Sequence, residues 1–348
     1  MPSPGPVWAE RERKFDWRGA LPWILGVLAV ACAAYWLFSC LRRERTSVMG
    51  QDEQLKLLRP QLTSEDAGTR ATAVRLLGEL GDPRAIPDVR ARLNDEKEQP
   101  EVLAQACLAL AGLKDKASVP AIRQRLEDAS PVVVAAACGA LAQFKDREAI
   151  PAIREKLDDG VPQVVVAACA ALAEFDDRES LPAIRKKLDD DSLEVVQAAF
   201  DTLVRFADQD SIPAIRAKLT HEEPDVIVGA CKALTALDDI GCGPLVVKLL
   251  DHAEPVVVCA AAQTLATLRH KEAVEPLARA LKSPDLSVRL AAVGALADLG
   301  DPAAIAPLQT LHVTPLEGLA AKATDEDVAR VREAIQGALA KLSPEKPK

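Results

Sequence analysis

The sequence predicts an all-α fold, a right-handed α-solenoid of about eight two-helix repeats with a period of 31 residues. Shifting the chain by this period places residues 149–157 on residues 180–188 and then on residues 211–219. No strand pattern separates these segments, and a fixed period in this range is typical of stacked helical repeats. One leucine anchors each repeat, and the spacing is broken only by a two-residue insertion near residues 96–99. The anchors are Leu62, Leu93, Leu126, Leu157, Leu188, Leu219, Leu250 and Leu281.

Each repeat is predicted to contain two helices. In the first, as at residues 287–299, apolar side chains fall on one stripe of a helix with about 3.6 residues per turn. The second, as at residues 150–157, has its own apolar stripe. An aspartate precedes the second helix and is expected to cap it by accepting backbone N–H groups. These aspartates are Asp82, Asp115, Asp146, Asp177, Asp208, Asp239 and Asp301.

Eight complete pairs are expected between about Asp66 and Leu311, and the chain continues beyond them at both ends. Residues 52–62 match the second helix of a repeat and predict a half-repeat. A helix from Thr324 to about Leu342 is expected to cover the last apolar face of the solenoid. The predicted organisation is an N-terminal tail at 1–19, a transmembrane helix at 20–41, a linker at 42–51, the solenoid at 52–342 and a disordered tail at 343–348.

The transmembrane prediction comes from residues 20–41, a run of 22 residues without a charge. A helix needs about 20 apolar residues to cross a bilayer, and Trp and Tyr near both ends are typical of membrane interfaces. A cleaved signal peptide is the alternative. The sequence thus predicts a single-pass membrane protein, and the side of the solenoid stays undetermined because basic residues flank both ends of the segment.

Two segments carry a family resemblance. Residues 77–87 (LGELGDPRAIP) and their echo at residues 297–305 (ADLGDPAAI) resemble the HEAT-like repeats of phycobilin lyases. The resemblance covers roughly residues 52–312 and implies a helical solenoid. It implies no single activity, since such repeats occur in scaffolds, chromophore lyases, DNA glycosylases and a di-iron hydroxylase.

Four cysteines occupy one position of the repeat, namely Cys107, Cys138, Cys169 and Cys231. A metal or redox ladder is one interpretation. However, equivalent residues of stacked helices lie about 8–10 Å apart, and a disulfide needs Cα atoms within about 7 Å. Small buried apolar side chains are therefore the favoured interpretation.

His221-Glu222 resembles the His-Glu pairs that bind iron in the HEAT-like deoxyhypusine hydroxylase. A second pair is missing, because Ala253 follows His252 one repeat later. The sequence contains no phosphate-binding glycine loop, no GxSxG motif and no HExxH motif. It therefore predicts no catalytic residue, no metal and no cofactor.

Basic residues recur in two rows on the second helices and are the candidates for binding a protein or peptide partner. The rows are expected to line the concave face, and solvated ion pairs with nearby aspartates are the alternative. Nucleic acid is disfavoured, because residues 46–348 carry a net charge of −12 and contain no Trp or Tyr to stack on bases. The rows are Arg90, Arg123, Arg154, Arg185, Arg216 and Arg92, Arg125, Lys156, Lys187, Lys218.

A third row lies on the first helices, which are apolar almost all round in the middle repeats. The end repeats carry Arg70 and Arg289 in this row, and an arginine there can send its charged head to water. The row either packs between neighbouring first helices or forms an exposed apolar strip that docks a second copy, another protein or the membrane. Its apolar members are Leu103, Val134, Val165, Val196, Ile227 and Val258.

These features predict a membrane-tethered scaffold rather than an enzyme. It is expected to bind a protein or peptide on the concave face of the solenoid. Two other functions stay open, an enzyme of the chromophore-lyase or deoxyhypusine-hydroxylase type and a nucleic-acid-binding protein.

Overall fold

The computed structural model of the chain describes residues 50–313 and 325–342, and every regular element within them is a helix. The chain divides into two compact units, residues 1–60 and residues 61–348. In the first unit, α2 (Gln51–Leu58) forms where the half-repeat is predicted. The two-helix repeats all lie in the second unit.

Within the described residues of the second unit there are eight pairs of helices, which confirms the number predicted from the period. Each pair is a long helix followed by a short one. The long helices are α3 (Ala67–Leu80), α5 (Pro100–Gly112), α7 (Pro131–Phe144), α9 (Pro162–Glu174), α11 (Leu193–Arg205), α13 (Pro224–Ala236), α15 (Pro255–Thr267) and α17 (Leu286–Leu299). The short helices are α4 (Ile86–Leu93), α6 (Val119–Gln124), α8 (Ile150–Glu155), α10 (Leu181–Lys186), α12 (Ile212–Ala217), α14 (Gly243–Lys248), α16 (Val274–Ala280) and α18 (Ile305–Val313).

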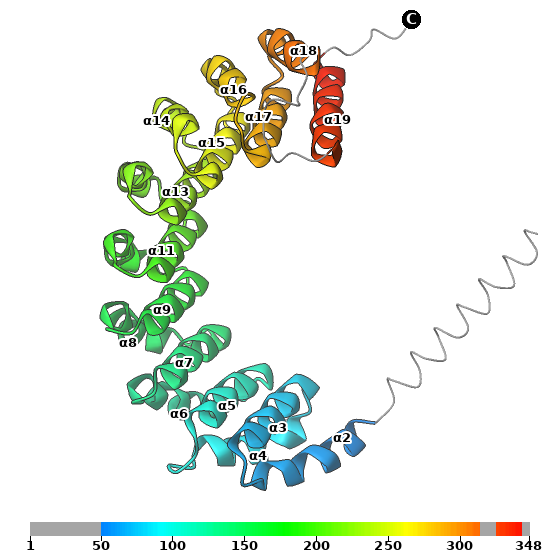
Figure 1. Cartoon of the computed structure of the whole chain (residues 1–348). Helices are drawn as coiled ribbons and strands as arrows, with labels where there is room; N and C mark the ends of the chain where they lie inside the picture. The colour runs from blue at the N-terminus through cyan, green and yellow to red at the C-terminus, as the bar shows by residue number, and fades with distance from the viewer. Residues whose placement is uncertain (1–49, 314–324, 343–348) are drawn as a thin grey trace, which may run out of the picture. The chain divides into compact units, whose positions relative to one another are not determined.

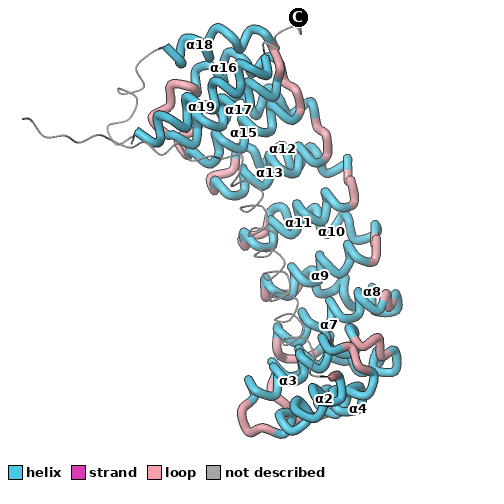
Figure 2. The backbone as a smooth tube through the Cα atoms, turned by 90° about the vertical axis from the view of Figure 1, so that its right-hand side faces the viewer, coloured by secondary structure: helices cyan, strands magenta, loops and turns pink. Residues whose placement is uncertain are grey.

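The helices of this unit form two layers. The long helices stack side by side in one layer, and the short helices form the other layer against them (Figure 1, Figure 2). Each long helix packs against the next long helix, and the short helices α4 to α16 each pack against the long helix that follows. Within the unit, the row of long helices lies on the inner side and the row of short helices on the outer side (Figure 1).

Local sequence explains where the long helices begin and end. Proline opens α5, α7, α9, α13 and α15, at a first helical position that needs no N–H donor. The turn after each long helix contains one residue in the left-handed backbone conformation, which ends a helix. This residue is Gly81, Lys114, Lys145, Asp176, Ala207, Asp238, Arg269 or Gly300, so the same turn recurs in all eight repeats.

The core lies between the two layers. The anchoring leucines from Leu93 to Leu219 are at most 2% exposed. The four repeated cysteines are fully buried with them and form no disulfide, which confirms the interpretation as small core residues. Burial raises the pKa of the Cys107, Cys138 and Cys231 thiols to about 12, so these thiols stay protonated at neutral pH.

A final helix, α19 (Asp325–Leu342), follows the last pair, as predicted. It packs against α17 and α18. Its apolar side is fully covered, since Val331, Ile335 and Ala338 are at most 3% exposed. The helix thereby covers the apolar face of the last repeat, as a solenoid end requires.

The structure corrects the predicted membrane anchor and, with it, the single-pass membrane localisation. Among the helices at residues 50–313 and 325–342, none combines the length and the apolar content needed to cross a bilayer. Residues 20–41, on which the anchor is predicted, lie outside the described residues, as do the predicted tails at 1–19 and 343–348.

Candidate partner-binding surface

Every arginine of the first basic row binds an aspartate of the following repeat. Arg90 Nη2 donates to Asp115 Oδ2 at 2.6 Å, and Arg185 Nη2 donates to Asp208 Oδ1 at 2.6 Å. The aspartate side chains are only 6–11% exposed, so these pairs hold successive repeats together. We call the set the arginine–aspartate ladder; its other rungs are Arg123–Asp146, Arg154–Asp177 and Arg216–Asp239.

The ladder corrects the predicted capping role for some of the repeated aspartates. Asp82, Asp239 and Asp301 do accept a backbone N–H of the turn that opens the second helix, as expected of caps. Asp146, Asp177 and Asp208 make no such side-chain bond. Their carboxylates bind the guanidinium groups of the previous repeat through charge-assisted hydrogen bonds. Asp239 has both roles, since it also binds Arg216.

The second basic row is also paired with carboxylates. Arg92 and Arg125 bind acidic residues that follow shortly in the chain, and the three lysines reach back to the previous repeat. The pairs are Arg92–Glu98 (3.2 Å), Arg125–Asp128 (3.2 Å), Lys156–Glu127 (3.1 Å), Lys187–Asp158 (3.4 Å) and Lys218–Asp189 (2.6 Å). Both basic rows lie in the outer layer of short helices, not on the concave face predicted for them (Figure 1). That they bind a partner stays a prediction.

The two-residue insertion near residues 96–99 brings a carboxylate into the interior. The Glu98 side chain is 2% exposed and accepts hydrogen bonds from Arg70 at 2.7 Å and Arg92 at 3.2 Å. Burial acts to raise the pKa of Glu98, but the hydrogen bonds from Arg70 and from the backbone of Gln99 outweigh it and hold the pKa below its usual value. Glu98 thereby joins the first two repeats.

The third row is buried rather than exposed as a strip. Its six apolar members, Leu103 to Val258, are 1–5% exposed. The two arginines of the row do not send their heads to water as expected. Arg70 Nη1 donates to the carbonyls of residues 64 and 65, and Arg289 Nη1 donates to those of residues 283 and 284. Each arginine therefore holds the loop that precedes its own helix.

Large apolar side chains remain exposed on the inner side of the long helices, which we call the long-helix face. Leu108, Val132, Leu193 and Val256 are 42–48% exposed there, each on a different helix. On α7 and α15, the exposed positions along this face carry no charge. A neutral, partly apolar surface of this kind is typical of protein–protein contacts.

The sequence alone does not predict the long-helix face, because helices that are apolar almost all round are expected to be wholly buried. One signal is present. Core positions stay apolar from repeat to repeat, whereas one exposed position holds a different residue type in almost every repeat. Its occupants are Leu108, Gly139, Ala170, Asp201, Lys232, Gln263 and Gly294.

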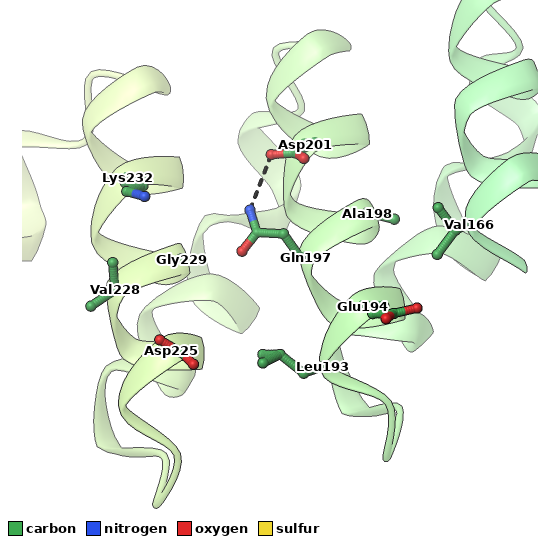
Figure 3. Close-up of a pocket in the computed structure, with 10 residues that line it drawn as sticks. All are labelled: Val166, Leu193, Glu194, Gln197, Ala198, Asp201, Asp225, Val228, Gly229 and Lys232. Carbon is green, nitrogen blue, oxygen red and sulfur yellow. Dashed lines mark hydrogen bonds between the residues drawn. The ribbon is translucent and has the colours of Figure 1, made fainter. Parts of the chain in front are cut away.

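A cavity of about 560 Å³ opens on this face along α11 and its neighbours (Figure 3). Its apolar lining includes Val166 of α9, Leu193 of α11 and Val228 of α13. Figure 3 shows Asp225 of α13 pointing toward Leu193. The remaining lining residues are Glu194, Gln197, Ala198, Asp201, Gly229 and Lys232.

Glycine at position 229 follows from the packing beneath the cavity. Phe200 is fully buried at the repeat position where α9 and α13 carry Cys169 and Cys231. A methyl group at Gly229 would approach the Phe200 ring to 2.9 Å and Gln197 Oε1 to 3.0 Å. The large Phe200 side chain of one repeat therefore requires a glycine at position 229 in the next repeat.

The sequence profile of HEAT repeats matches residues 40–100, 96–168, 155–235 and 243–323, which together make up most of the chain. The chain belongs to the HEAT-repeat family. No curated protein matches this HEAT-repeat protein at a significant level.

Three solved structures are similar to this HEAT-repeat protein. The Escherichia coli protein YibA has a TM-score of 0.54 and 18% identity, over 80% of this chain and 97% of its own. An engineered protein has a TM-score of 0.45 and 24% identity, over 83% and 88% of the two chains. Human deoxyhypusine hydroxylase in complex with glycerol has a TM-score of 0.33 and 22% identity, over 77% and 99%. At these identities the likeness to YibA concerns the fold alone, and the lower TM-scores of the other two carry no conclusion.

In this HEAT-repeat protein, His221 and His252 each bond to a backbone group two residues further along the chain. His221 Nδ1 accepts the backbone N–H of Glu223 at 3.1 Å, and His252 Nδ1 accepts that of Glu254 at 3.0 Å. Both histidines thus close the loop before a long helix. Within residues 50–313 and 325–342, His, Cys, Asp and Glu side chains form no group of three or more that could hold a metal ion.

Proposed function

We propose that this HEAT-repeat protein is an interaction scaffold that binds a polypeptide partner on the long-helix face. The observation that carries the proposal is the contrast between its two layers. The basic rows of the outer layer are bound to carboxylates of the chain itself. The long-helix face instead presents Leu108, Val132, Leu193 and Val256 to solvent.

The energetics favour the same surface. Covering apolar surface stabilises a complex by roughly 25 cal/mol for each Å² removed from water. A partner that binds the ladder must first displace carboxylates that already satisfy the arginines, so the net gain there is small. The exposed side chains recur on α5, α7, α11 and α15. An elongated partner can therefore contact several repeats at once, as is common for solenoid proteins.

Site-specific photo-crosslinking tests this proposal. A photoreactive amino acid is placed at Val132, Leu193 or Val256 on the long-helix face, and crosslinked proteins are identified by mass spectrometry from the native cells. Matched controls carry the same amino acid at Lys186 and Ala214, which are exposed on α10 and α12. We expect one set of polypeptides to crosslink from the long-helix face and not from the controls. Crosslinks from the controls alone would overturn the proposal.

A further inference from the structure

Resting on the proposed function, we infer that the cavity along α11 selects a partner segment in which an arginine or lysine lies beside an apolar side chain. On the long-helix face, this hollow of about 560 Å³ combines an apolar lining with several charges. Its volume is within the range of protein sites that hold a ligand group.

The apolar part of the cavity can accept an apolar side chain of the partner. Leu193 is 43% exposed at its edge, and Val166 and Val228 are partly exposed in its lining. Gly229 brings the backbone of α13 close to Phe200 beneath this lining, since a methyl group there would approach the ring to 2.9 Å. An isoleucine, leucine or phenylalanine of a partner would find apolar surface on three successive long helices.

The charged part of the cavity is unbalanced. Glu194, Asp201 and Asp225 contribute three carboxylates, and Lys232 contributes one ammonium group. Within the described part of the chain, none of these four residues forms an ion pair, unlike the basic rows of the outer layer. The one side-chain hydrogen bond that these carboxylates accept in that part comes from Gln197 Nε2 to Asp201 Oδ1 at 3.2 Å (Figure 3). The cavity therefore has capacity for a cation.

The repeat provides an internal comparison for this charge. At the repeat position of Glu194 and Asp225, the chain has Val132, Gln163 and Val256 in other long helices. At the position of Asp201, it has Gly139 and Ala170 in the two repeats before. Carboxylates thus gather at α11 and α13, while the same positions on α7, α9 and α15 are neutral.

A basic side chain fits both parts of the cavity. The methylene groups of arginine or lysine cover apolar surface while the charged head reaches a carboxylate. An arginine can also donate two parallel hydrogen bonds to one carboxylate, which gives directional selectivity. The neutral surfaces of α7 and α15 on either side then receive the rest of the partner without selecting for charge.

Selection from random peptides tests this inference even while the natural partner is unidentified. A phage-displayed library of random peptides is selected in parallel on the full chain, on the double variant Glu194→Gln with Asp225→Asn, and on the control Glu101→Gln. Glu101 is exposed on α5 at the same repeat position as Glu194. Binding of the enriched peptides to all three proteins is measured by fluorescence anisotropy at two salt concentrations, and circular dichroism verifies that the variants are folded.

We expect peptides enriched on the full chain to carry arginine or lysine next to an aliphatic or aromatic residue. These peptides should bind the double variant at least tenfold more weakly than the full chain, and bind Glu101→Gln as tightly as the full chain. Their binding should weaken as the salt concentration rises. Neutral or acidic peptides, equal binding to the double variant, or no enrichment on the full chain would each overturn the inference. If Val132 and Val256 still crosslink a polypeptide in that case, the scaffold function stands and only its selectivity is wrong. If the long-helix face crosslinks nothing, the scaffold function itself fails.

Discussion

Arg154 of α8 and Asp177 of the next repeat form a two-pronged ion pair, in which Nε donates to Oδ2 at 2.6 Å and Nη2 donates to Oδ1. The aspartate side chain is 7% exposed and the arginine side chain 33%. The same pairing recurs at five successive junctions of the solenoid. It adds a directional contact to the apolar stacking of the repeats, so the ladder helps to fix the register of one repeat on the next.

Removing one rung should destabilise the chain. Arg154→Leu leaves the carboxylate of Asp177 largely buried without its partner, and we expect the free energy of unfolding to fall by about 2 kcal/mol. Urea denaturation followed by circular dichroism measures the change. The control is Arg75→Ala, which breaks the pair with Glu79, whose two side chains are 47% and 58% exposed. It should cost less than about 0.5 kcal/mol, and equal losses for the two variants would contradict the role of the ladder.

Glu98 should make stability depend on pH in the acid range. Its pKa in the folded chain is lowered, against about 4.3 in an unfolded chain. A group whose pKa is lower in the folded chain stabilises the fold when the pH is above the unfolded-state pKa. This stabilisation is lost as the pH falls through the folded-state pKa. We therefore expect Glu98→Gln to be less stable than the wild type at pH 7 and to lose less stability below about pH 4. Melting temperatures from pH 2 to 7 test this, with Glu101→Gln as an exposed control. Parallel profiles for Glu98→Gln and the wild type would contradict it.

Substitutions in the third row test whether this row belongs to the core or forms an interface. Val165 and Val196 are 2% and 3% exposed, so the double substitution Val165→Arg with Val196→Arg introduces two charges into the buried interior. We expect the free energy of unfolding to fall by more than about 3 kcal/mol, because buried charges lack partners there. Thermal melting and size-exclusion chromatography measure stability and assembly together. A chain of wild-type stability that has lost self-association would instead support an exposed docking strip.

Two glycines of the long helices should respond in opposite ways to alanine. Gly229→Ala meets the Phe200 ring at 2.9 Å, and we expect a loss of about 1–3 kcal/mol from overpacking. Gly139→Ala has its nearest atom 3.9 Å away on Leu108, and we expect a gain of about 0.5–1 kcal/mol from helix propensity. Thermal melts of both variants test the pair. Partial rescue of Gly229→Ala by Phe200→Leu would locate the strain, and an unchanged melting temperature for Gly229→Ala would contradict the packing described.

Much of the fold could be read from the sequence because its determinants are local. The leucines from Leu62 to Leu281 repeat every 31 residues with a single two-residue break, and the turns that carry Leu126 to Leu250 pack against the long helix that follows directly in the chain. Proline and the left-handed turn residues mark helix ends within a few positions. The same local reasoning explains the correct count of eight pairs and the correct placement of α19.

The surface was harder to predict because it depends on contacts between repeats. Capping depends only on neighbouring residues, so the sequence suggests it for Asp177. In the structure this carboxylate instead binds Arg154, which lies one repeat earlier. The exposed side of α7 resembles its buried side, since Val132 at the surface and Val133 in the core are the same residue type. Only the packing of neighbouring long helices decides which of the two is covered.

The central claim is that the long-helix face, and not the outer layer, binds the partner. Quantitative mass spectrometry of proteins that copurify with the full chain tests it most directly, in three forms compared side by side. These are the wild type, the long-helix-face variant Val132→Glu with Val256→Glu, and the outer-layer variant Lys186→Glu with Lys248→Glu, all at exposed positions. Circular dichroism verifies that all three forms are folded. We predict that the amount of the crosslinked partner that copurifies falls at least tenfold with the long-helix-face variant and stays at the wild-type level with the outer-layer variant. Loss from the outer-layer variant with retention on the long-helix-face variant would contradict the claim.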